Sequence, residues 1–248
     1  MDFKFDKPSH IFTLLLLLGC FFLIFIFPII TFFILIDSPQ LIENLEISEI
    51  VALESQLLVI AIFILIPFAW YYFVNNLKFK EILRRIKLVT ENIDKAFLWG
   101  LLAAIIIFLI IFVIEFVLIK MGYKPQDLSN IPDIQRLFSW PVLFFLVAIQ
   151  PIGEEIFFRG FLFEKIEHFG GGIVAIFITA FLFGLAHISY GKIFPVLMPM
   201  VMGIVLGYIV FKTKNLYSSI IAHIIFNVTS LSLAYVGQHL LEQFALNL

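Results

Sequence analysis

Long apolar runs separated by short polar segments dominate the chain of 248 residues. Each run is near the length that crosses a bilayer as a helix, about 20 residues. Since a spanning segment must satisfy its own backbone hydrogen bonds in lipid, these runs predict helices. We expect an all-α integral membrane protein, a bundle of about seven transmembrane helices, with an eighth short span or a re-entrant end as the alternative. The expected spans are 11–36, 56–76, 96–119, 137–158, 170–190, 193–211 and 215–236.

Composition excludes several classes of protein. Hydrophobic residues make up 62% of the chain and charged residues only 14%, which is untypical of a soluble domain. A net charge of −2 gives no sign of a nucleic-acid partner. The single cysteine, Cys20, excludes an internal disulfide. Without a visible repeat or linker, we expect one multi-pass membrane domain over 1–248, with the lipid bilayer as its surroundings.

The distribution of lysine and arginine predicts the orientation. Basic residues gather in the N-terminal tail and before the last span, and most densely between the second and third spans (Lys78, Lys80, Arg84, Arg85, Lys87 and Lys95). The charged residues of the loop after the first span are all acidic. Because basic loops stay in the cytoplasm, we expect a cytoplasmic N-terminus and an extracytoplasmic C-terminus, in the cell membrane if the source is a prokaryote. The first run exceeds a signal-peptide core, so we expect it to remain as an anchor.

Three polar islands interrupt the last four spans. Carboxylates at membrane depth are costly and usually serve a function. Within each island, polar or aromatic residues are four positions apart, on one face of a helix. The islands are Glu154, Glu155 and Arg159, then Phe183 and His187, then His223 and Asn227. Glu115, near the end of the third span, could cap a cavity, but its closeness to Lys120 favours a surface acid.

The two adjacent acids are expected to differ in role. Glu155 and Arg159 have the favoured order for a helical ion pair, which would hold the helix. Glu154 points about 100° away and would remain available to water. Pro151 and Gly153 would loosen the helix just before the acids and admit water.

A glycine cluster at 170–172 predicts a turn between two antiparallel helices. Glu154 precedes this turn, and His187 follows it, by nearly equal lengths of chain. The two side chains are therefore expected at similar depth, about 24 Å from the turn. No argument from spacing places His223 at that depth.

These residue types indicate hydrolysis of a carbonyl compound, most naturally a peptide bond. A carboxylate and a histidine can hold and deprotonate water. A second histidine with an amide suits the oxyanion of a tetrahedral intermediate. Glu154, His187 and His223 would also form a zinc-ligand set with an open position for water.

The three islands resemble the motifs of the CPBP family, also called the Abi or CaaX-protease-like family, whose members are similar to the type II CaaX prenyl protease Rce. The pattern is Glu-Glu-x-x-x-Arg, Phe-x-x-x-His and His-x-x-x-Asn, and no position departs from it. The resemblance covers a catalytic core at 137–236. It implies an intramembrane endopeptidase with a site open to the cytosol and a peptide or protein substrate, prenylated in the CaaX case.

The resemblance also favours a mechanism without a metal cofactor, with zinc as the alternative. In that scheme Glu154 and His187 activate water, while His223 and Asn227 hold the oxyanion. Glu155, Arg159 and Phe183 support the site. The competing hypothesis is a non-proteolytic bacteriocin-immunity or scaffold protein that binds a partner through the same cavity. A small transporter using Glu154 as a proton site would more often have a repeat, and none is visible.

Overall fold

The computed structural model describes residues 3–37, 47–129, 131–188 and 192–246, and over these residues every regular element is a helix. In chain order the longer helices and the π-helical turns (η) are α1 (Pro8–Phe21), η1 (Phe22–Ile26), α2 (Phe27–Asp37), α4 (Glu49–Ala69), η2 (Trp70–Val74), α6 (Ile93–Lys120), α9 (Trp140–Glu155), η3 (Ile156–Leu162), α10 (Phe163–Leu185), α11 (Phe194–Thr213) and α12 (Tyr217–Leu246). Three short helices, α5 (Phe79–Arg85), α7 (Pro125–Leu128) and α8 (Ile131–Ile134), lie in the connections.

Six helical stretches among the described residues are long and apolar enough to cross a membrane. They are Pro8–Ile34, Glu49–Val74, Ile93–Lys120, Trp140–Leu185, Phe194–Thr213 and Tyr217–Leu240. The fourth is 46 residues long, about twice the length that a bilayer requires, and covers most of both the fourth and the fifth expected spans. The prediction of a helical membrane bundle with about seven spans is confirmed, and the protein is an integral multi-pass membrane protein.

The 46-residue stretch folds back on itself at Gly171. This glycine has φ 79° and ψ 171°, a non-helical conformation that residues with a side chain rarely adopt. The rings of Phe158 and Phe183 are 5.2 Å apart, whereas a straight helix would separate them by about 37 Å. Phe163 likewise packs in one cluster with Ala175. The expected turn at 170–172 is therefore present, and it brings the first two polar islands together.

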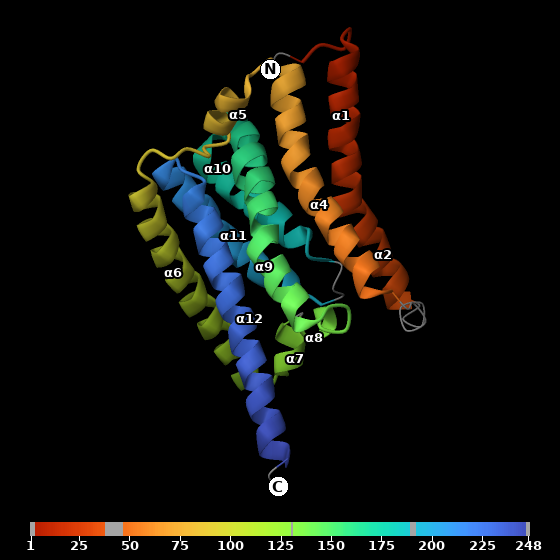
Figure 1. Ribbon diagram of the computed structural model, residues 1–248, viewed down its shortest axis with the longest axis vertical. Helices are drawn as coiled ribbons and strands as arrows, with labels where there is room; N and C mark the ends of the chain where they lie inside the picture. The colour runs from red at the N-terminus through yellow and green to blue at the C-terminus, as the bar shows by residue number, and fades with distance from the viewer. Residues whose placement is uncertain (1–2, 38–46, 130, 189–191, 247–248) are drawn as a thin grey trace.

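The bundle has two unlike ends (Figure 1). The start of α1, the end of α4, α5 and the turn of α10 lie at one end, which we call the basic end. The end of α6, α7, α8 and the start of α9 lie at the other end, which we call the α7–α8 end. Because α1 begins at the basic end and α12 ends at the other, the chain crosses the bundle an odd number of times.

Ion pairs tie the connections together at the basic end. Glu164 accepts a hydrogen bond from the Tyr71 hydroxyl at 2.9 Å and pairs with Arg85. Glu167 pairs with Lys87 at 3.2 Å and with Lys214 at 3.0 Å. These contacts fix the first turns of α10 against α5 and the end of α11.

Close helix packing behind the site depends on two glycines. A Cβ atom added at Gly184 would lie 2.6 Å from the carbonyl oxygen of Val196, and one at Gly203 would lie 2.9 Å from Cα of Ala180. Small residues let membrane helices approach closely. α10 and α11 can therefore pack backbone against backbone beside Arg159.

Candidate active site

A fully buried ion pair forms the base of the site. Nη1 of Arg159 lies 2.9 Å from Oε1 of Glu155, and both side chains are 0% exposed. The guanidinium also donates to the carbonyl oxygen of Gly203 at 3.4 Å and stacks 4.3 Å from the Phe183 ring centroid. The expected pairing of Glu155 with Arg159 is thus present, inside the bundle.

His223 links the pair to the second acid. Its Nδ1 lies 3.0 Å from Oε1 of Glu155, and its Nε2 lies 3.7 Å from Oε2 of Glu154. Because an ionised carboxylate only accepts hydrogen bonds, Nδ1 of His223 is the donor to Glu155. The second distance is beyond a direct hydrogen bond. His223 therefore joins the third polar island of the sequence to the first.

Glu154 is oriented by a neighbour that the sequence analysis missed. Nε2 of Gln150, one helical turn earlier on α9, donates to Oε1 of Glu154 at 2.7 Å. The sequence does contain a signal for this contact, because Gln150 is a polar residue within an apolar run, four positions before Glu154. Pro151 and Gly153 do not open the helix, since α9 continues through both. A Cβ at Gly153 would lie 3.2 Å from the carbonyl oxygen of Ile60, so this glycine serves close packing against α4.

Phe183 stands at the centre of the three islands. Its ring packs edge to face against His187 and His223, with centroids 5.0 and 5.6 Å away. The backbone oxygen of Phe183 lies 2.8 Å from Nδ1 of His187. Since a carbonyl oxygen accepts, Nδ1 of His187 is a donor, and in the neutral ring Nε2 is then an acceptor. The aromatic ring and its own carbonyl thus fix both histidines.

The four residues expected to be catalytic line one cavity of about 540 Å³. Glu154, His187, His223 and Asn227 contribute to its wall together with Gln150. Glu115 also lines it, which supports the alternative of an acid at the cavity over the favoured surface position. Most of the remaining wall is apolar and comes from α6, α9, α11 and α12.

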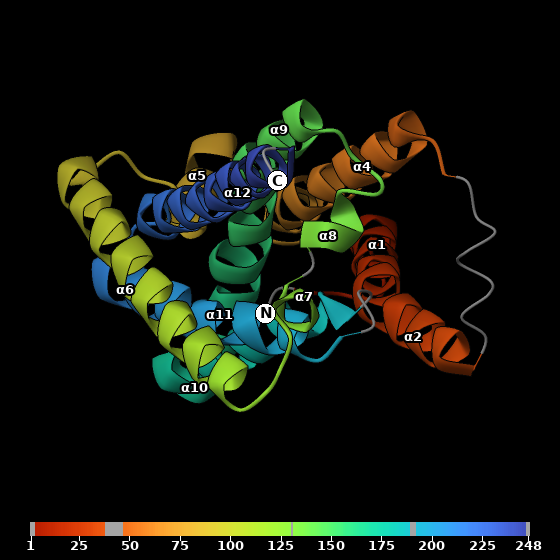
Figure 2. The same cartoon turned by 90° about the horizontal axis from the view of Figure 1, so that it is seen from below.

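The cavity extends from the acids toward the α7–α8 end. Its wall there includes Leu128 and Ser129 beside α7 and Ile131 and Ile134 on α8. Figure 2, seen from this end, has both short helices lying over the middle of the bundle. The basic loops lie at the opposite end. The basic loops were expected in the cytosol, and the family resemblance implied a cavity open to the same side, but this geometry does not allow both.

Within the part of the chain that the structure describes, no three His, Cys, Asp or Glu side chains are placed so that they could hold a metal ion. Nδ1 of His223 is engaged by Glu155 and Nδ1 of His187 by a carbonyl oxygen. Anchoring of Nδ1 by an oxygen orients a ring whose Nε2 binds water, and it is equally usual in histidines that bind zinc through Nε2.

Comparison with known proteins gives one family. Residues 136–229 match the family described as type II CAAX prenyl endopeptidase Rce1-like. No curated protein and no solved structure matches the chain. The matched residues contain all three polar islands, and the resemblance drawn from those islands is confirmed. Residues 136–229 are thus similar to the Rce1-like family of type II CAAX prenyl endopeptidases.

Proposed function

We propose that this protein is an intramembrane endopeptidase in which Glu154 activates a water molecule without a metal ion. The observation that carries the proposal is the cavity wall on which Glu154, His187, His223 and Asn227 meet. The similarity of residues 136–229 to an endopeptidase family supports the reaction class. The hydrogen bond from Gln150 supports Glu154 as the base, because it aims the carboxylate while the buried pair with Arg159 occupies Glu155.

The proposed donation to the oxyanion requires a proton on Nε2 of His223, because Nδ1 of that ring donates to Glu155. Glu154, Glu155 and Arg159 together carry one net negative charge, and all three side chains are buried. A buried charge is costly unless it is paired. A proton on Nε2 of His223 makes the cluster neutral and gives the ring a donor that faces the cavity.

Hydrolysis then proceeds in two steps. Glu154 takes a proton from water, whose oxygen attacks the carbonyl carbon of the peptide bond while His187 holds the water through Nε2. The carbonyl oxygen becomes an oxyanion, which accepts hydrogen bonds from His223 and from the amide of Asn227. Glu154 passes its proton to the amide nitrogen as the carbon–nitrogen bond breaks. The products are a carboxylic acid and an amine, and the enzyme returns to its starting state.

A cleavage assay tests this proposal. Purified protein is incubated with prenylated and unprenylated peptides, with and without a chelator, and products are identified by mass spectrometry. We expect cleavage that the chelator does not change. Loss of cleavage with the chelator and recovery with zinc would favour the metal alternative.

The substitution Glu154→Gln tests the proposed base, because it keeps the shape of the side chain and removes the carboxylate. We expect cleavage to fall by about 10²–10⁴, the usual contribution of a general base, with an unchanged unfolding temperature. Glu54→Gln, in an exposed carboxylate that does not line the cavity, serves as the control and should keep full activity. Full activity of Glu154→Gln would remove the enzymatic role and favour the immunity or scaffold alternative.

A further inference from the structure

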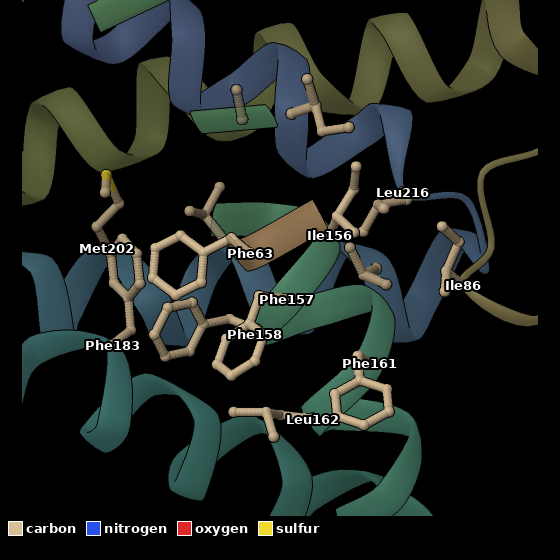
Figure 3. Close-up of a cluster of buried hydrophobic side chains, with 14 of the residues drawn as sticks. Phe63, Ile86, Ile156, Phe157, Phe158, Phe161, Leu162, Phe183, Met202 and Leu216 are labelled. Atoms are coloured by element: carbon tan, nitrogen blue, oxygen red, sulfur yellow. The ribbon is translucent and has the colours of Figure 1, made fainter. Parts of the chain in front are cut away.

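The interior is filled on one side of the acids. Directly after Glu155, η3 carries Phe157, Phe158 and Phe161, each at most 1% exposed. These rings pack with Phe63 from α4 and Phe183 from α10 (Figure 3). Since η3 leads from the acids toward the basic end, this cluster closes the route between the site and that end.

On the other side of the acids the interior is open. The cavity passes Phe226, Asn227 and Ser230 along α12 and reaches Ser129 beside α7. Along α6 it passes Ile111 and Glu115 and reaches Ile119, near the last residue of that helix. The single route from the acids that the described residues leave open therefore leads to the α7–α8 end.

The two ends carry very different numbers of basic residues. Among the described residues, the basic end carries Lys4, Lys7, Lys78, Lys80, Arg84, Arg85, Lys87, Lys95, Lys165, Lys212 and Lys214. The α7–α8 end carries Lys120, Lys124, Arg136 and Lys192. Short loops rich in lysine and arginine stay in the cytoplasm, and the difference between the two sides sets the orientation. The α7–α8 end is thus the one that faces away from the cytoplasm.

We infer that the active-site cavity opens to the non-cytoplasmic side of the membrane and takes a peptide segment with apolar side chains presented at that face. The side is the opposite of the one that the family resemblance implied. The peptide part of this inference rests on the proposed function. The side on which the cavity opens does not, because it follows from packing and charge alone.

The chemistry of the wall supports an apolar peptide. Between the acids and the α7–α8 end the cavity is bounded mainly by Phe, Ile, Leu, Met and Pro side chains. Phe112 and Leu233 line the cavity and are also 62% and 59% exposed on the outer surface. The rim therefore continues into the lipid-facing surface, so an apolar segment can enter without crossing a polar barrier. The volume lies in the range of about 300–1,000 Å³ that is usual for ligand sites.

Cysteine accessibility tests the side of opening. The full chain with Cys20→Ala provides a background without cysteine, into which Ser129→Cys, Ser230→Cys or Lys80→Cys is introduced. Ser129 marks the α7–α8 end, Ser230 the cavity wall and Lys80 the exposed face of α5. Intact cells that express each variant are treated with a membrane-impermeant maleimide before and after permeabilisation.

We expect Ser129→Cys and Ser230→Cys to react in intact cells and Lys80→Cys to react only after permeabilisation. Reaction of Lys80→Cys in intact cells would overturn the orientation. Failure of Ser230→Cys to react in intact cells, while Ser129→Cys does, would overturn the open route. Neither readout depends on cleavage.

A second arm tests the substrate. The same apolar peptide segment is fused to a membrane anchor so that it lies on either face of the membrane in cells that express the protein. We expect cleavage only on the non-cytoplasmic face, and cleavage only on the cytoplasmic face would overturn the inference. If neither fusion is cut and maleimide still labels the cavity from outside, the proposed enzymatic function fails while the direction of opening stands.

Discussion

At the scale of single residues, Glu155 connects two helices of the site. Its Oε1 accepts hydrogen bonds from the guanidinium of Arg159 and from the imidazole of His223. A carboxylate that joins two donors from different helices holds α9 and α12 in register at the depth of the cavity. Glu154, which shares its helix turn, accepts a hydrogen bond from the amide of Gln150 at 2.7 Å. The ion pair expected for Glu155 is present, and the chemical role of Glu154 stays a prediction.

Glu155→Gln should destabilise the protein. The substitution removes the charge that compensates Arg159, and breaking a buried ion pair costs about 3–5 kcal/mol. We expect a lower unfolding temperature in detergent, with cleavage lost as a consequence. Glu54→Gln is the control and should leave the unfolding temperature unchanged. An unaltered unfolding temperature for Glu155→Gln would show that the pair contributes no net stability.

Gln150→Leu should slow cleavage without loosening the fold. Hydrogen bonds to charged groups contribute about 1.5–3 kcal/mol, so we expect kcat to fall about 10- to 150-fold. KM should change little, because Gln150 acts through the position of Glu154. Gln56→Leu on α4, outside the cavity wall, should have no effect. A change confined to KM would mean that Gln150 contacts the substrate.

At the scale of helices, much of the site could be predicted from spacing. Pairs four residues apart gave the correct helix faces for Glu155 with Arg159 and for Phe183 with His187. The glycine cluster gave the fold-back at Gly171. Spacing could not place His223, because the depth of α12 depends on the connection at 214–216. Asn215 fixes that connection through hydrogen bonds to the backbone oxygens of Val89 and Glu91, contacts that are remote in sequence.

The close packing of α10 against α11 predicts that a methyl group added at Gly184 destabilises the protein. In Gly184→Ala the new Cβ would lie 2.6 Å from a backbone oxygen that cannot move away without shifting α11. Overpacking of this kind costs about 1–3 kcal/mol. Gly237→Ala is the matched control, since nothing lies within 4 Å of its added Cβ, and it should be neutral or stabilising. The unfolding temperatures of the two variants in detergent check the prediction. Equal values would mean that the helices separate freely.

At the scale of the whole molecule, the two ends differ in their ion pairs as well as in their number of basic residues. Glu164 and Glu167 tie the basic end together through their ion pairs. At the α7–α8 end the described contacts are fewer, such as Lys192 with Asp133. Which end is open could not be predicted from hydropathy, because it depends on how Phe157, Phe158 and Phe161 fill the interior. The sequence shows these phenylalanines but not the side of the acids that they occupy.

A reporter at the C-terminal end of the chain should be active outside the cytoplasm. The odd number of crossings and the excess of lysine and arginine at the basic end lead to this expectation. A phosphatase fused after Leu248 should be active and a green fluorescent protein dark. The same pair fused within 75–78 should give the reverse. A fluorescent C-terminal fusion would contradict the orientation.

The fold-back at Gly171 also limits how the gene for this protein can vary in length. Phe158 and Phe183 meet because the two arms of the hairpin are nearly equal in length. The number of residues between the first two motifs therefore decides whether they face each other. One codon added to either arm would rotate everything beyond it by about 100° and carry an acid or a histidine out of the cavity. Codons added before α1 would leave the spacing between these motifs unchanged. Insertions should therefore be accepted at the start of the gene and rejected between the codons for Glu154 and His187, as a scan for functional insertions would reveal.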